Sequence, residues 1–274
     1  MADLENPTGF SRPHKKASLA GAFFVAAIWL PAAQALCTAP ASLPVAQVER
    51  VVDGDTLRLS DGRNVRMVGL NTPETGKKGQ SAEPFAEAAK QRLQALVAES
   101  DGQVSLGVGQ QAKDRYGRVL ANVYGRNGAN LEAQLLSEGL GYLVAVSPNV
   151  ALVNCQQAAE QVARTAKLGL WRNSPVQPAA QVDKGGFALV AGTISSVQRN
   201  GGGLWIELQD GPVLRIAPEL IGQFDVPALL RMKGQRIEAR GWVVDRSRRG
   251  GLKPGQTRWM MPITHPAMLG VSSR

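Results

Sequence analysis

The clearest pattern in the chain is a series of short apolar or β-branched runs, each bounded by turn residues. Val48–Leu59 and Arg63–Leu70 are two such runs, and the Asp-Gly pair within Ser60–Gly62 is typical of a hairpin between them. Val104–Val108 and Val119–Tyr124 predict a second pair of strands about a polar turn. The first half of the chain is therefore expected to be built on strands.

Three segments of the same half have apolar residues at helical spacing. The first begins at Ser81, a candidate N-cap, and the second extends from the cap Asn130 to Gly139. Strands with interspersed helices indicate an α+β domain around a small barrel or sheet. The third predicted helix has on one face Cys155, Ala159, Val162 and Ala166.

The second half reads differently. Asn173–Lys184 has no periodicity and contains two prolines, which predicts a linker. A helical stretch is expected around Leu220–Arg231, and the rest is rich in short strands, so we expect a second, smaller and mostly β barrel. Its five predicted strands are Ala188–Val197, Leu204–Leu208, Val213–Ile216, Arg236–Val244 and Arg258–Ile263.

The first 35 residues are expected to lie outside the fold. Three basic residues precede the apolar run 17–30, and Ala33 and Ala35 supply the small residues of a cleavage site, so the segment is typical of a cleavable signal peptide. An uncleaved membrane anchor is the alternative, although the run is shorter than a spanning helix needs. Lipidation of Cys37 is disfavoured by Leu36. Export to a secreted or periplasmic location is therefore the prediction.

Composition narrows the class of protein. The chain has 274 residues, of which 44% are hydrophobic and 19% charged, a balance that excludes intrinsic disorder and a small staple-dependent scaffold. Its net charge of +9 favours a polyanionic partner. Residues 183–274 contribute +6 of that charge, against +2 from residues 36–182.

Cysteine and histidine counts restrict the chemistry further. Cys37 and Cys155 remain after the leader, and in an oxidising compartment they are expected either to form a disulfide or to stay as two separate thiols. His265 is the one histidine outside the leader and lies near no nucleophile motif. Catalytic triads and histidine-dependent nucleases are therefore excluded.

Several polar residues are ones that such a scaffold would not need. Acidic residues flank Gly54 at the end of a strand, and Asn71–Glu74 ends another, so the two together could supply the oxygen ligands that hard cations prefer. Each motif alone is also consistent with an ordinary turn. Alternation places Arg66 on the face of Val68, where it either meets an anion or extends outward. An oxygen cluster, a glutamate and arginines are what phosphodiester hydrolysis needs without histidine.

These residues carry a resemblance to the staphylococcal nuclease (thermonuclease) family over about residues 46–172. The resemblance implies a five-stranded OB-type barrel with three helices and a Ca²⁺-dependent nuclease that acts on DNA and RNA and leaves 3′-phosphates. The matching segments, in the family's order and spacing, are Val51–Thr56, Val65–Glu74, Asp114–Arg118 and Leu168–Trp171.

The same resemblance implies roles for particular residues. Asp55, Asn71 and the carbonyl of Thr72 would hold the cation. Glu74 would position or deprotonate the attacking water, with Arg66 and Arg118 binding the phosphate. The resemblance also implies contacts with the substrate from Lys77, Lys78, Arg115 and Tyr116.

The chain also departs from the family pattern. Asn71 stands where the reference member has an aspartate, which predicts weaker Ca²⁺ binding or another divalent preference. Ala145 and Ser147 replace two tyrosines near the nucleotide base. The loop after Glu74 is shorter, and its Lys77 and Lys78 are either phosphate contacts or solvated surface.

The domain boundaries follow from these segments: a signal peptide over 1–35, a nuclease-like domain over 36–174, a linker over 175–185 and an OB-like domain over 186–274. Barrels of the last type bind single strands through basic grooves and exposed aromatic rings. Trp205, Trp242, Trp259 and the basic loop 246–253 would form such a surface, unless the tryptophans fill the core. An inactive nucleic-acid-binding protein and a structural envelope protein are the alternatives to an enzyme.

Overall fold

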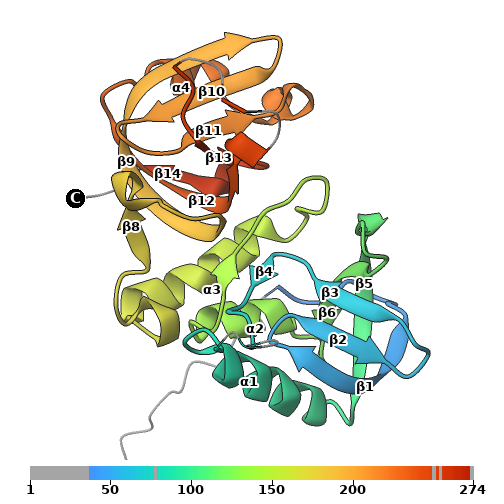
Figure 1. The fold of residues 1–274 in the computed structure, drawn as a ribbon. Coiled ribbons are helices and arrows are strands. Elements are labelled where there is room, and N and C mark those ends of the chain that lie inside the picture. Colours follow the sequence, from blue (N-terminus) through green and yellow to red (C-terminus); the bar gives the residue numbers. More distant parts are fainter. Residues whose placement is uncertain (1–36, 77–78, 80, 249–250, 253–254, 272–274) are drawn as a thin grey trace, which may run out of the picture. The chain divides into compact units, whose positions relative to one another are not determined.

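The computed structural model describes residues 37–76, 79, 81–248, 251–252 and 255–271. Its first part is a closed five-stranded barrel with the strand order β1-β2-β3-β6-β5, in which only β3 and β6 pair in parallel (Figure 1). A two-stranded sheet of β4 (Leu70–Asn71) and β7 (Tyr142–Leu143) lies outside the barrel. The barrel strands are β1 (Val45–Asp53), β2 (Thr56–Leu59), β3 (Asn64–Met67), β5 (Gln103–Lys113) and β6 (Val119–Tyr124).

The predicted hairpin about residues 60–62 is confirmed, because β2 and β3 pair antiparallel across it. The predicted run Val48–Leu59, however, is two strands, β1 and β2, separated by a turn at Gly54. A Cβ at Gly54 would lie 2.7 Å from Thr72 Oγ1 and 2.7 Å from Ala89 Cβ. Only glycine therefore allows this turn to approach Thr72 so closely, which brings the neighbouring acidic residues to the end of β4.

Three helices accompany the barrel: α1 (Ala86–Ala98), α2 (Leu131–Ser137) and α3 (Val153–Ala166). The Asn130 cap is confirmed, since its side chain accepts from the Ala133 amide. The expected cap at Ser81 is wrong, because α1 begins after Phe85, whose φ is 68°. Pro84 disfavours a helical conformation for the residue before it, so the helix starts later than the apolar spacing suggests.

The buried face of α3 also differs from the prediction. Val162 is 53% exposed, whereas Gln156 and Glu160 are buried with Ala159. The helix therefore buries two polar side chains that contact neighbouring strands, a choice that apolar spacing alone cannot reveal. The core of this first part is apolar, and the fully buried side chains in it include Leu57, Leu59, Met67, Leu93, Leu106 and Leu135.

The second part is also a five-stranded barrel, with strands β9, β10, β11, β13 and β12 in that order and closure between β12 and β9. The helical stretch expected at 220–231 is a 3-10 helix, η3 (Pro218–Gln223), followed by α4 (Val226–Leu230). Both predicted barrels are therefore confirmed. The strands are β9 (Gly186–Asn200), β10 (Gly203–Leu208), β11 (Val213–Ile216), β12 (Arg236–Asp245) and β13 (Trp259–Pro262).

In the second part, two short strands were not predicted. β8 (Val176–Pro178) lies in the expected linker and pairs in parallel with β9, and β14 (Leu269–Val271) pairs with β12. Part of the expected linker is thus an edge of the second sheet. Strands of three residues are too short to show an alternating pattern, which is why the sequence conceals them.

A buried ion pair joins the two barrels. Nη1 of Arg240 on β12 lies 2.7 Å from both carboxylate oxygens of Glu160 on α3, and one of those oxygens accepts from the Leu143 amide at 2.8 Å. The side chains of Arg240 and Glu160 are only 7% and 3% exposed. Arg164 and Glu238 form a second, bidentate pair at 2.9 and 2.8 Å beside it.

Cys37 and Cys155 form a disulfide that ties the start of the described chain to α3. The expected signal peptide lies outside the described residues. Within the described ranges, no helix has the length and apolar character that crossing a bilayer would require.

Candidate active site

Asp55 lies in the turn after β1 and is almost completely buried. Its carboxylate accepts from the Thr72 amide at 3.0 Å and from the Thr56 hydroxyl at 3.1 Å. Burial raises the pKa of the Asp55 carboxyl to about 6, while Arg66 opposes the rise and Asp53 adds to it. A carboxylate that is buried away from water is stabilised in its ionised form by a positive charge beside it.

Arg66 supplies such a charge. Its Nη1 lies 2.8 Å from Asp55 Oδ2, and its Nη2 donates to Asn71 Oδ1 at 3.2 Å. Its strand neighbours Val65 and Met67 point into the core, and Arg66 is half-buried on the other face, as is Val68. Of the two expected alternatives, Arg66 meets an anion, the carboxylate of Asp55. One guanidinium thus spans two of the three residues expected to hold a cation.

Thr72 and Glu74 follow directly on β4. Thr72 is buried, and Glu74 is exposed with its backbone amide bound by Glu83 Oε2 at 2.9 Å. Asn71, Thr72 and Glu74 line one cavity, so Glu74 opens onto the same space as the end of the oxygen cluster. Glu83 as a partner of Glu74 could not be predicted from the sequence, because the contact depends on how the intervening loop folds.

Arg118 lies in a separate turn between β5 and β6. Asp114 Oδ2 accepts from its Nε at 2.7 Å, and Asp114 Oδ1 accepts from the amides of Tyr116 and Arg118. Although burial acts to raise it, these hydrogen bonds hold the pKa of Asp114 below its usual value. Arg66 pairs with Leu120 across the ladder, so alternation puts Arg118 on the face of Arg66.

Arg115 and Tyr116 belong to the same turn. Arg115 Nη2 donates to the Tyr116 hydroxyl at 2.6 Å and lies over the ring, and Tyr116 is 69% exposed. Arg118 lies over that ring as well, 5.6 Å from its centroid. The turn therefore presents two guanidinium groups and an aromatic ring to solvent. Lys77 and Lys78 lie outside the described residues.

Ala145 and Ser147 both contact Thr264 of the second part. Ala145 accepts from the Thr264 hydroxyl at 2.6 Å, and the Ser147 hydroxyl contacts the Thr264 carbonyl at 2.9 Å. Small residues here let the second barrel pack against the first. Local patterns in the sequence cannot reveal these contacts, because they join residues 117 and 119 positions apart.

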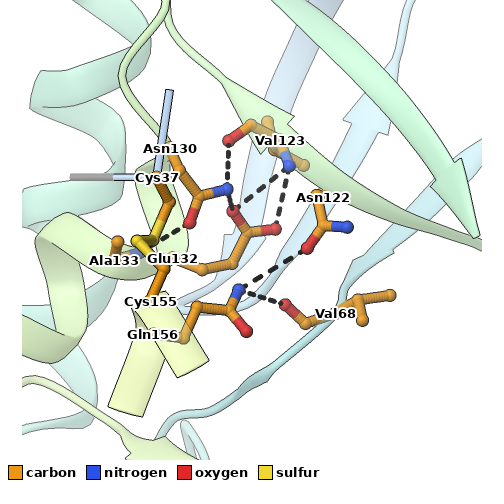
Figure 2. The surroundings of a disulfide bond; sticks show 9 residues. All are labelled: Cys37, Val68, Asn122, Val123, Asn130, Glu132, Ala133, Cys155 and Gln156. Carbon is orange, nitrogen blue, oxygen red and sulfur yellow. Dashed lines mark hydrogen bonds between the residues drawn. A yellow bond between two sulfur atoms is a disulfide. The ribbon is translucent and has the colours of Figure 1, made fainter. Parts of the chain in front are cut away.

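A buried carboxylate beneath the site was not anticipated. Both oxygens of Glu132 accept from the Val123 amide, at 2.9 and 3.2 Å, and Asn130 donates to one of them (Figure 2). Burial raises the pKa of Glu132 to about 8, although its hydrogen bonds and Arg66 act against the rise. Gln156 lies beside it and donates to the Val68 carbonyl at 3.1 Å (Figure 2).

Gly69 makes this arrangement possible. Its φ is +87°, and a Cβ there would lie 1.9 Å from Gln156 Oε1. The glycine therefore turns the chain from β3 into β4 and leaves room for the Gln156 side chain. Asn71 and Thr72 reach the oxygen cluster because of this turn.

Comparison with known proteins identifies a family and several relatives that this chain resembles. The family described as Staphylococcal nuclease homologue matches residues 64–173. A thermonuclease of Staphylococcus hyicus is 34% identical over 131 residues, which are 46% of this chain and 75% of that protein. The chain belongs to the staphylococcal nuclease family.

Two further relatives come from Bacillus subtilis (strain 168). The SPbeta prophage-derived endonuclease YokF is 35% identical over 128 residues, and endonuclease YncB is 34% identical over 131. The aligned regions cover 45% and 46% of this chain but only 43% and 61% of those proteins. The family match runs from β3 through α3, and the second barrel lies beyond that range.

The oxygen donors of the site suit a hard cation of the kind that this family typically uses. Within the described residues there is no group of three or more His, Cys, Asp or Glu side chains that could hold a metal. Asp55 would therefore be helped by the amide oxygen of Asn71 and by the Thr72 carbonyl. Arg66 contacts both Asp55 Oδ2 and Asn71 Oδ1. These two oxygens therefore lie close enough together to share one positive charge.

Proposed function

We propose that this chain is an exported, cation-dependent nuclease that hydrolyses DNA or RNA, favours single strands and leaves 3′-phosphates. The observation that carries the proposal is the convergence of Asp55, Arg66 and Asn71 beside the cavity that Glu74 lines. Membership of the nuclease family supports the same activity. The net positive charge suits a polyanionic substrate.

The proposed roles follow from what each group can do. Glu74 is an exposed carboxylate and would take the proton of the attacking water, whose oxygen bonds to phosphorus as the bond to the 5′-oxygen breaks. Arg66 and Arg118 would bind the phosphoryl oxygens, and Arg118 would serve the leaving 5′-oxygen. A bound Ca²⁺, held by Asp55, Asn71 and the Thr72 carbonyl, would supply electrostatic stabilisation of the phosphoryl charge.

Export is the second part of the proposal. The Cys37–Cys155 disulfide supports it, because disulfides persist mainly in oxidising compartments. The apolar leader supports it too, since its charge pattern and small residues are typical of a cleavable signal. A secreted or periplasmic location follows from these two features.

The role of Glu74 is tested with the conservative variant Glu74→Gln, assayed on single-stranded DNA and RNA. We expect cleavage to fall by about 100- to 10,000-fold, the range that loss of a general base produces. Glu87→Gln is the matched control, since Glu87 is exposed on α1 and does not line the cavity. Equal rates for Glu74→Gln and the unmodified chain would remove Glu74 from the mechanism.

A further inference from the structure

A cavity of about 970 Å³ extends from the proposed active site to the second barrel. Thr72 and Glu74 line one side of it, and Phe187 on β9 and Trp242 on β12 line the other. We call this space the interbarrel cavity. Its position means that a substrate strand leaving Glu74 in this direction would meet the second barrel.

A series of aromatic rings lines the interbarrel cavity. Tyr142 on β7 stacks on Phe187 with ring centroids 5.6 Å apart and planes at 28°, and Phe187 meets Trp242 edge-on at 5.2 Å. Trp242 nevertheless remains 40% exposed. Packing between the barrels alone would favour its complete burial, so an exposed indole at the cavity wall is available to a flat ligand.

Two cationic side chains also line the interbarrel cavity. Lys184 and Arg172 line it and are exposed, and neither has a carboxylate partner in the described part of the chain. Glu74 and Glu83 line it as well, so the lining holds as many carboxylates as cations, and one oxygen of Glu83 accepts from the Glu74 amide. Cations beside an exposed aromatic ring are the pair of features that recognise a nucleotide, through its phosphate and its base.

We propose that the interbarrel cavity binds the nucleic-acid strand next to the cleaved phosphodiester, with an unpaired base stacked on Trp242 and backbone phosphates bound by Lys184 and Arg172. The proposal rests on the nuclease function and assigns part of its substrate to the second barrel. A base can stack on an indole only when it is not already paired and stacked in a duplex, so the cavity selects single strands.

The test measures binding and cleavage separately in the whole chain. Binding of a 12-nucleotide oligothymidine is followed by fluorescence anisotropy in chelator, and cleavage of the same strand is followed with cation present. Trp242→Ala should raise the Kd by about 5- to 150-fold, the range that loss of one base–aromatic stack predicts. Trp242→Phe should restore most of the affinity, and the Kd for a blunt duplex should not change.

Charge is tested in parallel. Lys184→Ala should weaken binding and reduce its salt dependence, whereas Lys233→Ala, at an exposed lysine that does not line the cavity, should leave both unchanged. The cleavage defect of Trp242→Ala should appear in KM and be absent from kcat, because Trp242 binds a part of the strand that is distant from the reacting atoms.

The outcomes separate the two proposals. If Trp242→Ala binds and cleaves the oligonucleotide like the unmodified chain, the interbarrel subsite is wrong and the nuclease function stands. If the unmodified chain never cleaves but Trp242→Ala loses single-strand binding, the subsite stands and the nuclease function is wrong.

Discussion

Asn71 sets the charge of the proposed cation site. Its amide oxygen already accepts from Arg66, so a carboxylate in its place would face the same position with an added negative charge. We expect Asn71→Asp to lower the Kd for Ca²⁺ by about 10-fold, because the number of charged ligands tunes the affinity of such sites. Isothermal titration of both proteins measures it, and equal affinities would show that residue 71 does not contact the cation.

Glu132 makes stability depend on pH. Its pKa is about 8 in the fold against an ordinary value of 4.5, so the folded state keeps a proton that the unfolded state releases. The stability from this group is complete below pH 4.5 and is lost as the pH rises through 8. Between pH 5 and pH 8 the free energy of unfolding should fall on the order of 3 kcal/mol because of Glu132.

The measurement for Glu132 is urea unfolding at the two pH values for the unmodified chain and Glu132→Gln. The variant has no carboxyl to ionise, so its loss of stability between pH 5 and pH 8 should be clearly smaller. Comparing the two proteins removes the contribution of Asp55, whose raised pKa acts in the same direction. Parallel pH curves would mean that Glu132 does not titrate in this range.

The turn between β5 and β6 holds Arg118 by one ion pair. Asp114→Asn keeps an oxygen for the Tyr116 and Arg118 amides but removes the charge that fixes the guanidinium. We expect cleavage to slow by about 10- to 100-fold, since misplacing a group that binds the reacting phosphate is costly. Stability should change by less than about 1 kcal/mol, as for other partly exposed pairs.

Asp61→Asn is the matched control for Asp114→Asn. Asp61 accepts from the Arg63 amide and pairs with its guanidinium in the hairpin between β2 and β3, a turn of the same kind outside the proposed site. Cleavage assays and urea unfolding of both variants measure the loss of activity and the change in stability. A similar loss of activity in the two would attribute the effect to general disturbance of the barrel.

The features of the fold that can be predicted from the sequence are those that local signals determine. The Asp-Gly hairpin and the Asn130 cap act within a few residues and were correct. The start of α1 was wrong because Pro84 overrides the apolar spacing. The buried face of α3 was wrong because Glu160 and Gln156 are stabilised by partners far along the chain.

The candidate site divides in the same way. The resemblance to the nuclease family assigned Asp55, Arg66 and Asn71 to one site, and in the structure Arg66 contacts the other two. The contact of Glu83 with Glu74 could not be foreseen, because it forms across a loop without a pattern. The interbarrel cavity depends on packing between two barrels, and no periodicity encodes that.

The two barrels share a buried ion pair, so they are expected to unfold together. Arg240→Met would leave Glu160 buried without its partner, and removing one member of a buried pair costs about 3–5 kcal/mol. Adding Glu160→Gln should restore part of that loss, because the uncompensated charge disappears. Calorimetry should give one transition for the unmodified chain, and two well-separated transitions would show that the barrels are independent.

The most direct test of the proposed enzyme is cleavage of a 5′-labelled single strand by the unmodified chain, with Ca²⁺, with Mg²⁺ and with chelator. We expect cutting that needs a divalent cation, and products that a 3′-phosphatase shifts on a gel because they end in 3′-phosphates. Tight binding of the strand without cutting under any cation would contradict the proposal and would identify the chain as a nucleic-acid-binding protein that has kept the nuclease fold.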